Sequence, residues 1–241
     1  MERIRHMTEP TAIQSALTGI GDQPRLGRVF LKDQVNDLLR DTIISGRFPP
    51  GTKLIEREVA DNLGVSRAPV RDALLQLEKE GLVVSKPNGR YVIELTEQDI
   101  REMYQVRNAL EKLAVELATQ NIRREQAVKL QQIMEDMKDA QIREDWLAFS
   151  KSDLETHLLI WNLSGNGHLE NYLNSMSGPI FMFVASNAEY LDWNEPLELH
   201  QELVDNITGG NIQQAVQSIQ RHLDSALERT LRVLEIHKAQ R

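Results

Sequence analysis

The spacing of apolar residues between positions 54 and 83 predicts two short helices joined by a tight turn. Leu54, Val59 and Leu63 supply one apolar stripe, and Gly64 stands where the chain must turn sharply. Ser66 is placed to cap the second helix. The apolar stripe of that helix comprises Val70, Leu74, Leu77 and Leu82. This pattern is typical of a helix-turn-helix.

Two further elements flank this pair of helices. Residues 31–45 show helical spacing, and residues 81–95 (GLVVSKPNGRYVIEL) are two β-rich runs around a Pro-Asn-Gly turn, with Lys86 and Arg90 on either side. Residues 29–95 are therefore predicted to form a winged helix-turn-helix of three helices and a β-hairpin. Residues 1–28 lack hydrophobic periodicity and are predicted to be a flexible tail.

The rest of the chain, residues 96–241, reads as helical almost throughout. Helices are predicted over 97–120, 123–142, 145–163, 168–190, 195–208 and 211–237. Residues Thr96 to Asp99 resemble a capping box, and Gly178-Pro179 should kink or divide the fourth helix. The predicted fold is mainly α, with a C-terminal all-α antiparallel bundle of six or seven helices.

Two arginines predict what the N-terminal part binds. Arg67 and Arg71 lie four residues apart on the polar face of the second helix, at the end that a helix-turn-helix presents to the major groove. A guanidinium group can bind guanine or phosphate there. The net charge of −8 does not argue against this, because residues 1–95 carry 14 Lys and Arg against 13 Asp and Glu, whereas residues 96–241 carry 14 against 23.

Composition narrows the remaining possibilities. The chain has no cysteine, so it has neither disulfides nor thiolate metal ligands. No apolar run approaches the ~18 residues of a membrane span, and the N-terminus lacks a signal-peptide pattern. We therefore expect a cytoplasmic protein without a membrane partner.

The histidines suggest a second site. Asp153 and His157, four residues apart, project from one helix face, His200 follows Pro196, and His222 lies within an apolar stripe. One carboxylate and three imidazoles suit zinc, nickel or another transition ion. Because a histidine on an apolar face is more often a hydrogen-bonded core residue, spacing alone leaves both interpretations open.

Residues 31–95 resemble the DNA-binding domain of the GntR family of bacterial transcription regulators. The resemblance lies in PPGTKLIEREVADNLGVSRAPVRDALLQLEKEGLV and in NGRYV. It implies operator-contacting residues in the helices and wing, which are Arg57, Ser66, Arg67, Arg71, Gly89 and Arg90.

Residues 96–241 resemble the FCD ligand-binding domain that defines the FadR subfamily. The matching segments are VRNALEKLAVELA, SDLETHLLIWNLSGN, ELHQELVDNITGGN and RHLDSAL. The resemblance implies a divalent metal bound by Asp153, His157, His200 and His222. It also implies that Arg107 pairs with a carboxylate effector, although Arg107 could equally be a surface residue paired with Glu111.

These features together predict a metabolite-responsive, sequence-specific transcriptional regulator that is not an enzyme. We expect a homodimeric repressor on a palindromic operator, with zinc as the favoured metal and a small carboxylate metabolite as effector. One alternative is a metal-dependent hydrolase with a DNA-binding appendage, which the absence of HExxH or another general-base signature disfavours. Another is a regulator whose metal is purely structural.

Overall fold

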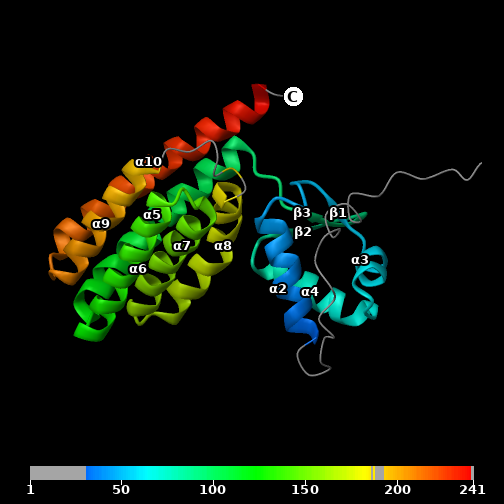
Figure 1. The fold of residues 1–241 in the computed structure, drawn as a ribbon, viewed down its shortest axis with the longest axis horizontal. Coiled ribbons are helices and arrows are strands. Elements are labelled where there is room, and N and C mark those ends of the chain that lie inside the picture. The colour runs from blue at the N-terminus through cyan, green and yellow to red at the C-terminus, as the bar shows by residue number, and fades with distance from the viewer. Residues whose placement is uncertain (1–30, 186, 188–192, 240–241) are drawn as a thin grey trace, which may run out of the picture. The chain divides into compact units, whose positions relative to one another are not determined.

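The computed structural model describes residues 31–185, 187 and 193–239. The chain divides into two compact units, Met1–Glu94 and Leu95–Arg241 (Figure 1). The tail predicted over residues 1–28 lies outside the described residues. Each unit is considered separately below.

The described part of the first unit is a winged helix-turn-helix. Its elements are α2 (Leu31–Ile44), β1 (Lys53–Leu54), α3 (Glu56–Leu63), α4 (Arg67–Lys79), β2 (Val83–Lys86) and β3 (Gly89–Val92). Strands β2 and β3 are antiparallel and form the predicted hairpin, with Lys86 opposite Gly89. The short strand β1 pairs with β3 on its other side, so the sheet order is β1-β3-β2. We did not predict β1, because two residues are too few to show an alternating pattern.

The turn between α3 and α4 has the predicted geometry. Gly64 ends α3 in the left-handed conformation, at φ 65° and ψ 30°, which glycine adopts without a steric penalty. Ser66 occupies the N-cap position of α4 with extended backbone, although its side chain makes no capping hydrogen bond. The apolar stripes of α2 and α4 pack together, and buried there are Val35, Leu39, Ile43, Val70, Leu74 and Leu77.

The described part of the second unit is an all-α bundle. Its six helices are α5 (Glu97–Asn121), α6 (Arg124–Ile142), α7 (Trp146–Leu163), α8 (Gly167–Ala185), α9 (Asn194–Thr208) and α10 (Ile212–Ala239). The predicted capping box begins α5, since Thr96 Oγ1 accepts from the Asp99 amide and Asp99 accepts from the Thr96 amide. Pro179 lies inside α8 without dividing it. The predicted extension of this helix to residue 190 reaches beyond the described segment.

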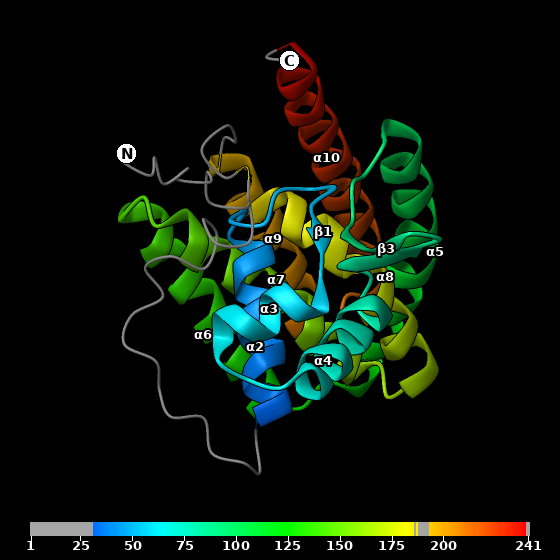
Figure 2. The same ribbon diagram turned by 90° about the vertical axis from the view of Figure 1, so that its right-hand side faces the viewer.

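Helix α5 is the central element of the bundle. It packs against α7, α8 and α10, and α10 also packs along α9 (Figure 1 and Figure 2). Because α7, α9 and α10 each supply candidate metal ligands, this packing decides whether those ligands meet. Among the described residues, no helix combines the length and apolarity needed to cross a membrane.

Candidate metal centre and nucleic-acid interface

The structure brings the four predicted metal ligands together. Asp153 and His157 come from α7, His200 from α9 and His222 from α10, and one ligand atom from each lies within 4.8 Å of all the others. We call this set the histidine cluster. Its three imidazoles are buried, and the Asp153 side chain is 14% exposed. The three helices therefore deliver three nitrogen donors and one oxygen donor to one point.

Hydrogen bonds outside the cluster orient two of the imidazoles. His200 Nδ1 lies 2.7 Å from the carbonyl oxygen of Pro196, which can only accept, so we place a proton on Nδ1. His157 Nδ1 lies 2.7 Å from Glu111 Oε2 and donates to it in the same way. In the neutral form of each ring, Nε2 then carries a lone pair that points into the cluster.

The inward-facing atoms need a cation between them. His200 Nε2 lies 2.7 Å from Asp153 Oδ1, and His157 Nε2 lies 3.2 Å from His222 Nε2. Neutral imidazoles would set lone pairs against each other or against a carboxylate at these distances. His222 Nδ1 is buried without a hydrogen-bond partner among the described residues. The donor set and its outer hydrogen bonds fit a tetrahedral or five-coordinate transition ion with room for a further ligand.

The electrostatics of the cluster point the same way. Burial disfavours the charged form of His157, but the charge of Glu111 and hydrogen bonds to Asp153 and Glu111 raise its pKa to about 9. Burial followed by the charges of His200 and His157 lowers the pKa of His222 well below its usual value. The pKa of Asp153 stays well below its usual range despite burial, because His200 and His157 stabilise the carboxylate. The site therefore favours positive charge at its centre.

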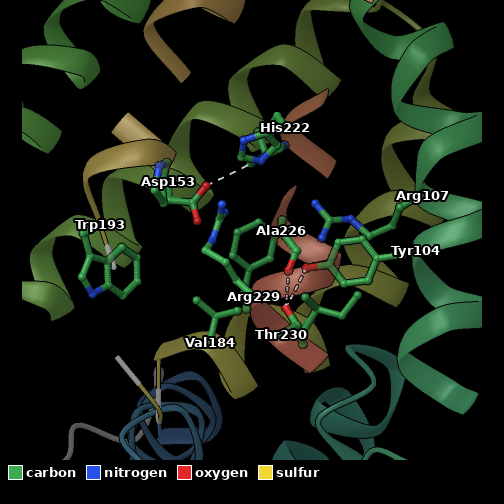
Figure 3. Close-up of a pocket in the computed structure, with 13 residues that line it drawn as sticks. Tyr104, Arg107, Asp153, Val184, Trp193, His222, Ala226, Arg229 and Thr230 are labelled. Carbon is green, nitrogen blue, oxygen red and sulfur yellow. Dashed lines mark hydrogen bonds and ion pairs between the residues drawn. The ribbon is translucent and has the colours of Figure 1, made fainter. Parts of the chain in front are cut away.

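A cavity of about 30 Å³ adjoins the cluster. Its walls come from α5, α7, α8, α9 and α10, and Figure 3 shows Arg107 and Arg229 extending into it from different helices, near Asp153 and His222. The Tyr104 hydroxyl lies 3.1 Å from Thr230 Oγ1 on the same wall. This volume holds a water molecule or two, since one water needs about 10–15 Å³ on this measure.

Arg107 is not the surface residue that one of our interpretations assumed. It does pair with Glu111, at 2.7 Å, but the side chains are only 2% and 1% exposed. The guanidinium also lies over the rings of Tyr104 and Phe181. Arg107 therefore lines the cavity beside the histidine cluster, with its charge matched by a buried carboxylate.

The sequence analysis overlooked the second role of Glu111. Its Oε1 accepts from Arg107, while Oε2 accepts from His157 and from Trp161 Nε1 at 3.3 Å. Burial would raise the pKa of Glu111, but the charges of Arg107 and His157 and their hydrogen bonds lower it to about 2. A signal was present in the sequence, because Glu111 shares a helical stripe with the apolar residues Ala114, Val115 and Ala118.

The first unit gathers most of its predicted DNA-contacting residues around one groove. This groove, which we call the reading groove, lies between the start of α3, the start of α4 and the wing. Among the residues lining it are Lys53, Arg57, Arg67, Lys86, Gly89 and Arg90. Ser66 is exposed beside it, at the N-terminal end of α4.

Two of the predicted arginines have acidic partners within this unit. Glu56 lies 3.2 Å from Arg71 Nε and 2.9 Å from Arg90 Nη1. Arg90 also lies 3.5 Å from Glu78, and its side chain is only 21% exposed. The wing therefore offers less free positive charge than we expected, whereas the Arg57 side chain is 71% exposed and the Arg67 side chain is also exposed.

Comparison with known proteins agrees with this architecture. The chain matches the bacterial regulatory proteins of the gntR family over residues 31–93 and the FCD domain over residues 102–225. It is 30% identical over 206 residues to an uncharacterized HTH-type transcriptional regulator of Bacillus subtilis (strain 168), YdhC, covering 84% of this chain and 92% of that protein. It is also 30% identical over 198 residues to the gluconate operon transcriptional repressor of the same organism, covering 79% and 81%.

The fold is likewise shared with a solved structure. E. coli McbR/YncC superimposes with a TM-score of 0.71 at 23% identity, over 84% of this chain and 97% of that one. The winged helix-turn-helix and the separate helical bundle define a two-domain transcriptional regulator. The chain belongs to the GntR family and carries an FCD domain.

Proposed function

We propose that this chain is a metabolite-responsive repressor of the FadR subfamily, whose helical domain binds a divalent metal and a small carboxylate. The observation that carries the proposal is the convergence of three imidazoles and one carboxylate beside a cavity lined by arginine. Zinc suits this N3O donor set, and nickel is the next candidate. The ion would be held by Asp153, His157, His200 and His222 and would supply a Lewis-acid site for the carboxylate.

The chain's own residues would orient that carboxylate. Arg107 extends from α5 into the cavity, where its guanidinium could pair with the ligand. Glu111 would hold both Arg107 and the ligand histidine His157 in place, because its carboxylate contacts both. The aromatic and apolar lining would exclude water and so strengthen the ion pairs.

Ligand binding would alter how the bundle packs. A cavity of about 30 Å³ is too small for an organic acid, so a ligand would have to widen the space among helices that line it. A ligand shifts a conformational equilibrium only by its differential affinity for the two states, typically about 1–3 kcal/mol. We propose that a homodimer transmits this difference to two reading heads on a palindromic operator, and that ligand binding releases the DNA.

DNA would be contacted by the exposed end of α4 and the reading groove. Arg57, Ser66 and Arg67 are exposed there, and Glu56 holds Arg71 at the edge of the same surface. Replacing Arg67 and Arg71 with alanine should weaken operator binding. A lost base contact would cost about 1–3 kcal/mol at one base pair, whereas a lost phosphate contact would reduce the salt slope by about one unit. The matched control is Lys79→Ala, at the far end of α4.

The deciding experiment measures metal, effector response and DNA binding together. The full chain would be used to select its operator from random DNA, and operator affinity would be measured with and without a panel of organic acids. Metal content would be read by elemental analysis. A His200→Ala, His222→Ala variant should lose both metal and acid response while still binding operator. His168→Ala, an exposed histidine on α8, should change neither.

The same experiment separates the other interpretations. An acid response that survives loss of the metal would make the metal structural and refute the sensing part of the proposal. Chemical conversion of the acid would favour the hydrolase. The two B. subtilis relatives compared above are named as regulators and give that alternative no support.

A further inference from the structure

We propose that Arg229 forms a second anion subsite in the cavity, so that the effector is a small acid with two acidic groups. This inference rests on the proposed function, because it assumes that an acid binds beside the metal. The evidence is the difference between the two arginines that extend into the cavity.

Arg107 has its charge compensated within the protein core. Both its side chain and that of Glu111 are almost fully buried, and their polar atoms lie 2.7 Å apart. A ligand carboxylate approaching Arg107 would have to share this guanidinium with Glu111. Arg107 is therefore already occupied in large part.

Arg229 has no comparable partner among the described residues. Its side chain is only 13% exposed, yet the nearest carboxylate is Glu195 at 3.8 Å, which is itself 56% exposed. Its other polar contact is the neutral hydroxyl of Ser225. Burial lowers the pKa of Arg229. A buried guanidinium with so little compensation would gain most from an anion entering the cavity.

Charge balance extends this argument to the ligand. The charged side chains lining the cavity are Arg107, Asp153 and Arg229, and Glu111 lies directly behind Arg107. These four charges cancel. A divalent ion held by the neutral imidazoles and Asp153 would leave the site at +2, which a dianion neutralises and a monoanion does not.

The geometry places the two positive centres apart. The histidine cluster is one, and Arg229 on α10 is the other, with the Tyr104 and Thr230 hydroxyls on the same cavity wall (Figure 3). One acidic group would sit against the metal and the other against Arg229. The small cavity favours a short, unbranched diacid such as a four- to six-carbon dicarboxylate or sugar diacid, with hydroxyl groups to meet Tyr104 and Thr230.

The test compares acids of equal length that carry one or two carboxylates. Zinc-loaded full-length protein would be titrated calorimetrically with butanoate and butanedioate, with the five-carbon pair, and with gluconate and its diacid glucarate. Zinc content would be checked after each titration to exclude removal of the metal. At least one diacid should bind about tenfold or more tightly than its monoacid, because it adds a hydrogen-bonded charge pair.

Variants at Arg229 identify the source of the preference. Arg229→Gln should abolish it while leaving zinc content and monoacid affinity unchanged, and Arg229→Lys should retain part of it. Arg232→Gln, an exposed arginine on the same helix, should behave as the wild type. If the wild type binds both acids of every pair equally, or Arg229→Gln keeps the preference, this inference is wrong and the proposed function stands. If zinc-loaded protein binds no acid at all, the proposed function fails with it.

Discussion

Replacing Glu111 with glutamine tests whether the buried Arg107–Glu111–His157 chain stabilises the helical unit. The change keeps the side chain's size but removes the negative charge between two buried donors. The folded protein lowers the pKa of Glu111 from 4.5 to about 2. A shift of this size corresponds to roughly 3 kcal/mol in favour of the ionised form. Stranding a buried charge by removing its partner costs a similar amount, about 3–5 kcal/mol.

The sign of this contribution sets the conditions of the assay. Because the pKa is depressed in the folded state, the stabilisation is complete above the unfolded value of 4.5 and is lost as the pH falls through about 2. At pH 7 it is fully present. All three tryptophans, Trp146, Trp161 and Trp193, belong to the helical unit, so tryptophan fluorescence reports on that unit alone. Urea unfolding of metal-free protein should then show a midpoint lower by about 1 M or more for Glu111→Gln.

Two comparisons make the result interpretable. Glu116→Gln changes an exposed carboxylate on the same helix and should leave stability within about 0.5 kcal/mol of the wild type. Adding Arg107→Met to Glu111→Gln removes the stranded guanidinium, so the double variant should lose less than the sum of the single losses. Zinc affinity of Glu111→Gln should also fall by about 10–100-fold. An unchanged urea midpoint would refute the claim that the buried chain stabilises the unit.

The remaining predictions concern pH, the wing and assembly. Burial opposes ionisation of Glu80, but hydrogen bonds from Arg40 and Gln76 lower its pKa overall. Stability of the first unit should therefore fall as the pH drops below about 4.5, and Glu80→Gln should flatten that dependence in circular dichroism melts. Gly89 has φ 140°, so Gly89→Ala should destabilise the first unit by roughly 1 kcal/mol, read from the same melts. Residues 95–241 expressed alone should fold and sediment as a dimer at micromolar concentration, and a strict monomer would contradict this.

The amino-acid sequence alone was enough to predict most of the helices and the ligand set. Helical spacing, the left-handed Gly64 and the capping box at Thr96 depend on residues within a few positions of one another. The pair Asp153 and His157 is local in the same sense, because one helix turn brings them together. Resemblance to a known family supplied the two histidines from other helices.

Only the tertiary structure decided which charges are free. Arg90 meets Glu56 across 34 positions and Glu111 meets His157 across 46, and no local pattern specifies either contact. Arg229 entered the cavity, and strand β1 joined the wing, through the packing of elements distant in sequence. Burial turned the pair Arg107 and Glu111 from an ordinary surface contact into a support for the histidine cluster. The physical reason is that the strength of an ion pair depends on the dielectric surroundings, which arise only when the elements pack.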